Sequence, residues 1–221
     1  MNTSANSPID CLGVILAGGL SSRMGQDKAQ LTRDSVNGNS AQSMLDFSKQ
    51  LLLDAGISTV VISGDQHQIP DLLPQSGPVG GIYSVLNHYL KQYPEHLQPK
   101  SLLILPVDLP LMTASAIAEL RLKGELSQKA TFFSDTQQQA HHIPLFLPNN
   151  AFLHNFLSQA FKQESLLTNS NGINNSKKSA PSVRSMLAQV PHQNIVNKSA
   201  HHTLFNTNTP EQWQQAQQKI K

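Results

Sequence analysis

The stretch GVILAGGLSSRMGQDKAQL, residues 13–31, passes from apolar residues into a turn of small, polar and cationic residues. Its apolar start is typical of a parallel strand buried on both faces, and open α/β sheets bind ligands at the carboxyl ends of such strands. Gly18 and Gly19 let a ligand approach the backbone, whose N–H groups can bind an anion. Arg23 and Lys28 add positive charge that suits phosphate. The stretch therefore predicts a phosphate or nucleotide site.

Two common nucleotide motifs do not fit this turn. The dinucleotide fingerprint GxGxxG fails, because Leu20 and Arg23 stand where its second and third glycines are required. The P-loop requires Gly-Lys-Ser or Gly-Lys-Thr at its end, but Gln26 and Asp27 follow Gly25. The sequence therefore indicates neither a nicotinamide-dependent dehydrogenase nor a P-loop NTPase.

The rest of the chain continues as alternating strand and helix patterns. Short apolar runs predict strands at 12–17, 59–63, 101–107, 130–134 and 143–147. Apolar residues at helical spacing predict helices near 44–55, 82–89, 114–120 and 150–162. Gly56 is expected to end the first of these helices, and Thr113 to cap the third. This order predicts an α/β fold with a mostly parallel central sheet flanked by helices.

Composition limits the class of protein. The chain has 221 residues, enough for one α/β domain, and 16 basic against 14 acidic residues give a net charge of +2. A net charge this small, with 5% aromatic residues, does not indicate a protein that binds nucleic acid or an anionic membrane. Neither a signal peptide nor a membrane span is apparent, so a cytoplasmic protein is expected. Cys11 is the single cysteine and is expected in the core, and the polar stretches 32–43 and 168–180 are expected to be loops.

A long motif carries a family resemblance. The segment LAGGLSSRMGQDKA, residues 16–29, resembles the signature of the molybdenum cofactor guanylyltransferases, a group of nucleotidyltransferases. The resemblance continues in SGPVGGI (76–82), PVDLPLM (106–112) and FNTNTPEQW (205–213), in the order found in the family. These blocks span nearly the whole chain.

The resemblance implies a Rossmann-like nucleotidyltransferase fold and transfer of GMP from GTP to molybdopterin carrying molybdenum, with release of pyrophosphate. It implies Mg²⁺ as cofactor and molybdoenzyme-maturation proteins as further partners, with no role for nucleic acid or membrane. It also implies one domain, 1–221, with a GTP-binding half at about 10–125 and an acceptor-binding half at about 126–221.

The resemblance further assigns roles to single residues. Arg23, Lys28 and Asp108 would be catalytic, and Asp108 would also bind the metal. Asn206 and Asn208 would lie on the molybdopterin side. The residues that would bind GTP are Leu16, Ala17, Gly18, Gly19, Lys28, Ser63, Asp71 and Asp108.

The residues themselves support a metal-assisted transfer. Asp108 follows an apolar strand, so its carboxylate is expected at the same crevice as the glycine turn. One aspartate is enough for Mg²⁺ if a triphosphate and water supply the other ligands. Asp108 could instead cap a helix, but Thr113 is better placed to do so. An attacking phosphate oxygen is already ionised near neutral pH, so positioning and charge neutralisation would suffice for catalysis.

Some alternatives stay open at this point. A molybdopterin cytidylyltransferase or a sugar-phosphate nucleotidyltransferase would show a similar turn, and a nucleotide-binding regulator without catalysis is a third possibility. The combination of Arg23, Lys28 and Asp108 argues against the regulator. The neighbouring histidines at 141–142 and 201–202 are expected to line a surface or site and not to chelate a metal in pairs, because adjacent strand residues point to opposite faces.

Overall fold

The computed structural model describes the chain apart from residues 1–7, 19–23, 26, 34–40, 168–179, 198–201 and 221, and apart from the side chains of 162–167. The strands are β1 (Cys11–Leu16), β2 (Thr32–Arg33), β3 (Gln42–Ser43), β4 (Thr59–Ser63), β5 (Ser101–Pro106), β6 (Ala130–Ser134), β7 (Ala140–Pro148) and β8 (His192–Val196). The α-helices are α1 (Met44–Asp54), α2 (Gly77–Gln92), α3 (Ala114–Ser127), α4 (Ala151–Leu167), α5 (Val183–Leu187) and α6 (Pro210–Ile220), and short 3₁₀ turns lie at Lys28–Gln30 and Glu95–Leu97.

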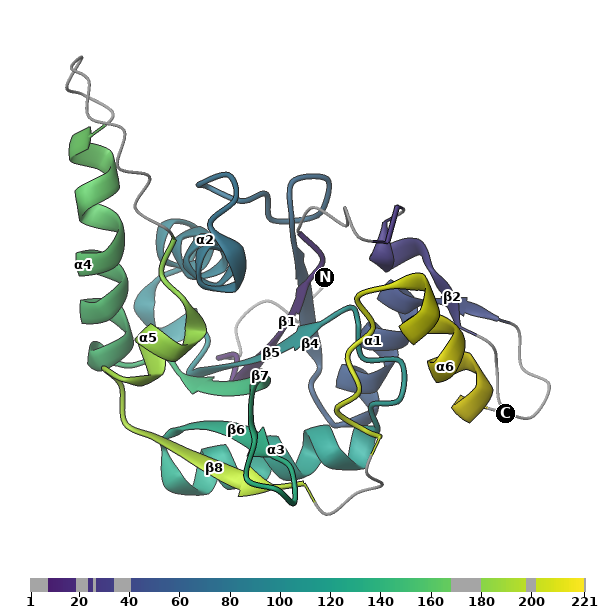
Figure 1. Ribbon diagram of the computed structural model, residues 1–221. Helices are drawn as coiled ribbons and strands as arrows, with labels where there is room; N and C mark the ends of the chain where they lie inside the picture. The colour runs from purple at the N-terminus through teal and green to yellow at the C-terminus, as the bar shows by residue number, and fades with distance from the viewer. Residues whose placement is uncertain are drawn as a thin grey trace, which may run out of the picture.

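A six-stranded sheet with the order β4-β1-β5-β7-β6-β8 forms the centre of the molecule (Figure 1). The neighbours β4, β1 and β5 are parallel to one another, and β6 is parallel to β8. Strand β7 runs against both of its neighbours, β5 and β6. The predicted mostly parallel sheet flanked by helices is therefore confirmed, with one reversed strand in its middle.

Alternate residues of the central strands enter two separate hydrophobic clusters, one on each face of the sheet. Ile15 and Leu105 belong to the cluster that packs against α1 and α3. Val14 and Ile104 belong to the cluster that packs against α2, α4 and α5. All four side chains are fully buried, and Figure 1 shows helices on both faces. Burial on both faces explains why the first strand reads as a continuous apolar run.

Most of the predicted elements are confirmed. Strands β4 and β6 have the predicted bounds, and β1 and β5 differ from theirs by one residue. Thr113 caps α3, since its Oγ1 accepts a hydrogen bond from the Ala116 N–H at 3.3 Å. Gly56 follows the end of α1 with φ +82°, a conformation that glycine adopts without strain. Cys11 is buried in the core, as expected, and burial raises the pKa of its thiol to about 11.

The differences lie where the apolar pattern is weak. Helix α3 continues to Ser127, past the predicted end at Leu120, although Leu122 and Leu126 on its last turns are exposed. Helix α4 continues past residue 162, and β7 begins three residues before its predicted start at 143. Helix α5 and strand β8 were not predicted. Strands β2 and β3 were not predicted either, and they pair at the two ends of the stretch 32–43, which was expected to be a loop. The parts of the two polar stretches at 34–40 and 168–179 lie outside the described residues. No helix in the described part of the chain is long and apolar enough to cross a membrane.

Helix α3 lies close to the sheet because Gly124 faces Phe146 of β7. A Cβ atom at Gly124 would overlap the Phe146 ring, which is buried and cannot swing into solvent. We therefore expect Gly124→Ala to lower the free energy of unfolding by about 1–3 kcal/mol, because overpacking outweighs the gain in helix propensity. Urea unfolding would measure this, with the exposed neighbour Lys123→Ala as control. An unchanged midpoint would mean that the ring can shift at no cost.

Candidate nucleotide site

The turn after β1 lies against the turn after β4. The Ala17 N–H donates a hydrogen bond to the Ser63 carbonyl at 2.9 Å, which extends the pairing of the two strands. Beyond it, Gly64 has φ +149°, and a Cβ atom there would lie 2.9 Å from the Gly18 nitrogen. Only residues without side chains let the two turns approach this closely. Packing of the two turns thus requires glycine at 64, in addition to the ligand access that the sequence suggested at Gly18.

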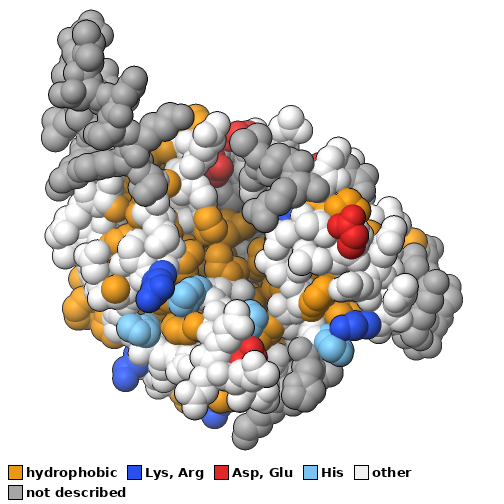
Figure 2. All heavy atoms as spheres, in the orientation of Figure 1, with side chains coloured by type: hydrophobic (Ala, Val, Ile, Leu, Met, Phe, Trp, Pro, Cys, Tyr) orange, Lys and Arg blue, Asp and Glu red, His pale blue; other side chains and the backbone are white. Residues whose placement is uncertain are grey.

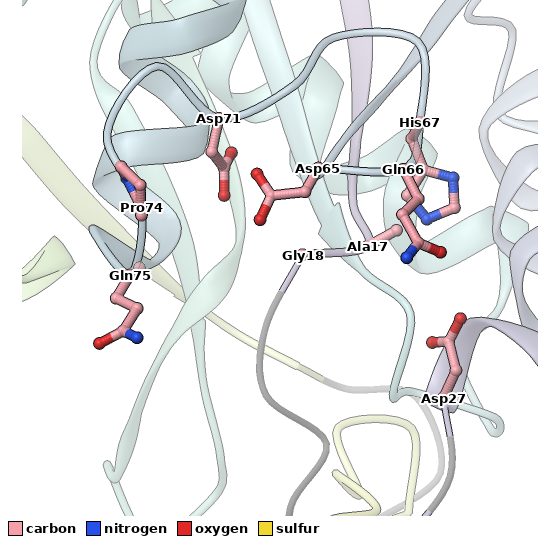
Figure 3. Close-up of a pocket in the computed structure, with 10 residues that line it drawn as sticks. Ala17, Gly18, Asp27, Asp65, Gln66, His67, Asp71, Pro74 and Gln75 are labelled. Carbon is pink, nitrogen blue, oxygen red and sulfur yellow. The ribbon is translucent and has the colours of Figure 1, made fainter.

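A cavity of about 500 Å³ opens beside these turns, a volume suited to a small-molecule ligand (Figure 3). Ala17 and Gly18, which belong to the turn after β1 and were predicted to bind GTP, line this cavity. The loop between β4 and α2 supplies most of the remainder. The lining residues are Ala17, Gly18, Asp27, Asp65, Gln66, His67, Asp71, Pro74, Gln75 and Gly77.

Asp71 lies at one wall of this cavity, and its carboxylate approaches the glycine turn. Its Oδ1 accepts a hydrogen bond from the Ser63 hydroxyl at 3.4 Å, and its Oδ2 lies 3.2 Å from the position of a Cβ atom on Gly18. Figure 3 shows Asp65 on the same side of the cavity. Burial, followed by the nearby charge of Asp65, raises the pKa of the Asp71 carboxyl above its usual 3.8. The structure thus brings together Ser63, Asp71 and Gly18, three of the residues that the sequence analysis assigned to GTP binding.

Lys28 and Asp108 form an ion pair although 80 positions separate them in the chain. The Lys28 Nζ lies 3.0 Å from Asp108 Oδ2, and it also donates a hydrogen bond to Asn208 Oδ1 at 2.7 Å. The two charged side chains are only 16% and 15% exposed. Asp27 caps the 3₁₀ turn that carries Lys28, because its carboxylate accepts the Ala29 N–H at 3.0 Å. A partly buried cation is therefore held by side chains from two distant parts of the chain, Asp108 and Asn208.

The second carboxylate oxygen of Asp108 is in a different situation. Oδ1 is buried and has no hydrogen-bond partner among the described residues. Leaving a buried carboxylate oxygen unpaired is costly, and an oxygen-seeking cation such as Mg²⁺ would satisfy it. No group of three or more His, Cys, Asp or Glu in the described part of the chain could hold a metal alone. Asp108 therefore fits a magnesium site in which the nucleotide phosphates and water supply the other ligands.

The segment before α6 is fixed to the end of β5. The Thr207 N–H and hydroxyl both donate to the Asp108 carbonyl, at 2.9 and 3.2 Å. Asn208 is partly buried and contacts Lys28, whereas Asn206 is exposed. The two asparagines assigned to the molybdopterin side thus differ in environment, and one of them touches the lysine assigned to GTP.

The remaining residues singled out from the sequence lie in different environments, and some lie outside the described part of the chain. Leu16 is partly buried and packs against the hydrophobic cluster under α2. Gly19 and Arg23 lie outside the described residues, as does His201. The His141 Nε2 lies 3.8 Å from Asp135 Oδ2, while the neighbouring His142 ring meets the edge of Phe132. Those two histidines therefore contact different partners, as the strand geometry predicted.

Sequence reasoning missed several wall residues of the cavity. Asp65, Gln66 and His67 follow Gly64 just after β4, and their signal is only that they are polar residues near the carboxyl end of a parallel strand. It also missed the contact between Lys28 and Asn208, since no local pattern links residues 180 positions apart.

Comparisons with known proteins agree with this geometry. Residues 13–170 match the family model of the MobA-like NTP transferase domain. The chain is 31% identical to a molybdenum cofactor guanylyltransferase of Xanthomonas euvesicatoria pv. vesicatoria over 205 residues, which cover 91% of each chain.

Solved structures show the same fold. Molybdopterin-guanine dinucleotide biosynthesis protein A from Archaeoglobus fulgidus superposes with a TM-score of 0.64 and 15% identity, over 94% of this chain and 97% of that one. A nucleotidyl transferase from Methanothermobacter thermautotroptrophicus gives a TM-score of 0.55 and 13% identity, over 95% and 97% of the chains. With a family match over most of its length and this fold, the chain belongs to the family of MobA-like NTP transferase domains.

Proposed function

We propose that this chain transfers GMP from GTP to molybdopterin carrying molybdenum and releases pyrophosphate. The observation that carries the proposal is the ion pair between Lys28 and Asp108, because Asp108 Oδ1 is buried and has no partner among the described residues. The name of the Xanthomonas relative supports this choice of substrates. The proposal includes one domain over 1–221, with the nucleotide half at about 10–125 and the acceptor half at about 126–221. The proposal also includes the cytoplasmic location expected from the sequence, and molybdoenzyme-maturation proteins as the further partners that the family resemblance implies.

The cavity beside Gly18 is proposed to hold the nucleoside. The guanine base carries N–H donors on one edge, and the Asp71 carboxylate can accept them. Ser63 orients that carboxylate through its hydroxyl. The backbone of the turn would contact the nucleotide at Leu16, Ala17, Gly18 and Gly19.

Transfer requires a new bond between an acceptor phosphate oxygen and the α-phosphorus of GTP. The bond from the α-phosphorus to the bridging oxygen breaks, and pyrophosphate leaves with that electron pair. Lys28 and Arg23 are proposed to neutralise charge on the triphosphate, which lowers the barrier without a general base. Asp108 would hold Mg²⁺ through Oδ1, and the ion would add positive charge at the phosphates.

The acceptor is proposed to bind on the face seen in Figure 2. This face is hollowed over the central strands, and hydrophobic side chains are visible in the hollow. An apolar surface suits the flat ring of a pterin, and exposed amides such as that of Asn206 can bind its polar edge. Asn208 lies on the same segment, beside Lys28.

A product assay tests the proposal. The protein is incubated with Mg²⁺, molybdopterin carrying molybdenum, and either GTP or CTP, and the nucleotide in the product is identified. A guanine dinucleotide product with pyrophosphate release is expected. A cytosine product would favour the cytidylyltransferase, transfer only to a sugar phosphate would favour that class, and binding without turnover would favour a regulator.

The raised pKa of Asp71 gives the proposed guanine contact a pH dependence. A carboxylate accepts the guanine N–H groups only when it is ionised, so GTP affinity should fall as the pH drops through this raised pKa. The fall should begin at a higher pH than an ordinary aspartate would give. Asp71→Asn should bind GTP about tenfold more weakly at neutral pH and lack this acidic phase.

Calorimetry across the acidic range would measure both effects. The difference between wild type and Asp71→Asn isolates Asp71 from the titration of the phosphates. Asp54→Asn, at an exposed position at the end of α1, is the matched control. If Asp71→Asn had the same acidic phase as the wild type, the guanine contact would be assigned to the wrong residue.

A further inference from the structure

Among the described residues, two contacts of the Lys28 ammonium are present, and they leave one of its N–H donors unused. An ammonium group carries three N–H donors. Asp108 Oδ2 takes one at 3.0 Å and Asn208 Oδ1 takes another at 2.7 Å. Within the described part of the chain one donor remains for a phosphate oxygen, so Lys28 can contact a triphosphate while keeping both of these partners. The Lys28 ammonium is therefore preorganised for a phosphate ligand.

Asn208 is held in place by hydrogen bonds around its backbone, so its side chain can act as a fixed partner of Lys28. Its backbone N–H donates to Gln212 Oε1 at 2.7 Å, and the preceding residue, Thr207, is bound twice to the Asp108 carbonyl. The backbone that carries the Asn208 side chain is therefore anchored on one side to α6 and on the other to Asp108, the residue that pairs with Lys28. A long, flexible lysine side chain loses less freedom on binding when its partners are already fixed.

The Asn208 side chain has no role in capping α6. Thr209 Oγ1 accepts the Gln212 N–H at 3.4 Å, and Gln212 Oε1 accepts the N–H groups of Asn208 and Thr209. This is a reciprocal capping arrangement, and only the backbone of Asn208 takes part in it. The side chain is left to contact Lys28, so replacing it should not remove the helix cap.

We infer that Asn208 is a positioning residue for Lys28, and that the segment before α6 completes the phosphate end of the nucleotide site. The inference rests on the proposed function only in taking the ligand of Lys28 to be a nucleoside triphosphate. Asn208 lies beyond residues 13–170, the region that matches the family model. It adds a nucleotide-side role to a residue that the family resemblance places with molybdopterin.

Calorimetry with GTP and Mg²⁺, without acceptor, tests the inference. Asn208→Leu keeps the size of the side chain but cannot accept a hydrogen bond. Lys28 then has one fixed partner fewer before GTP binds, and we expect GTP affinity to fall by up to about tenfold, the cost of immobilising one flexible side chain on binding. Asn155→Leu, at an exposed asparagine on α4, is the matched control and should bind GTP as the wild type does. Asn208→Ala is the second variant should the leucine impair folding.

A double-mutant cycle separates positioning from a structural effect. In a Lys28→Met background, Asn208→Leu should change GTP affinity less than twofold, because Asn208 acts through the lysine. An equal loss in both backgrounds, or no loss in the wild-type background, would overturn the inference.

The same cycle with CTP distinguishes this inference from the choice of base. A wild-type protein that prefers CTP would contradict the guanylyl proposal. Loss of CTP affinity in Asn208→Leu, absent in the Lys28→Met background, would still support the positioning role, since both nucleotides carry the same triphosphate.

Discussion

Asp108→Asn should lower the rate of guanylyl transfer by about a thousandfold or more at ordinary Mg²⁺ concentrations. The substitution removes the charge of the only carboxylate that pairs with Lys28 among the described residues. A cation that neutralises phosphate charge contributes several kcal/mol to the transition state, and each 1.36 kcal/mol is about a tenfold change in rate. Transfer rates across a Mg²⁺ titration would measure the loss.

The fold should survive this substitution. Thr207 binds the backbone carbonyl of Asp108, which the change leaves in place, and the asparagine oxygen can still accept from Lys28. Asp10→Asn is a matched control, because Asp10 is an exposed aspartate that also pairs with a lysine. It should transfer at the wild-type rate. A rate near wild type for Asp108→Asn, with a normal unfolding curve, would show that the metal is held elsewhere.

The nucleotide half of the fold was predictable because its signals are local. The runs at β1, β4 and β5 are apolar on both faces, which is the pattern of buried parallel strands, and Thr113 and Gly56 mark helix ends by their own chemistry. The two glycines of the turn likewise predict that a ligand approaches the backbone closely. Each of these features depends on neighbours within a few positions in the chain.

The missing parts depend on contacts between distant residues. Strand β8 is an edge strand whose residues are all intermediate or exposed, although it is paired with β6. Its sequence HQNIV therefore has no buried face that would mark it as a strand. The direction of β7 is set by its pairing with β5 and β6. In the site, the family resemblance assigned both Asn206 and Asn208 to the acceptor, but the fold also brings Asn208 into contact with Lys28.

Lys28→Met should weaken GTP binding about thirtyfold and also destabilise the protein. The first effect follows from loss of a charge-assisted hydrogen bond to phosphate, which is stronger than a neutral one. The second follows because Asp108, only 15% exposed, loses the cation that offsets its burial. Breaking a fully buried pair costs about 3–5 kcal/mol, so we expect about 1–3 kcal/mol for this partly exposed one. Calorimetry and urea unfolding without Mg²⁺ would measure the two effects.

The origin of the instability can be identified by a second substitution. Adding Asp108→Asn to Lys28→Met removes the unpaired carboxylate, so the double variant should be more stable than Lys28→Met alone. The exposed pair Lys100–Asp10 is the matched control, with side chains 66% and 70% exposed. Because solvent screens that pair, Lys100→Met should cost less than about 1 kcal/mol. If Asp108→Asn instead added its own cost to that of Lys28→Met, charge burial would not explain the loss, and the two residues would act independently in the folded protein.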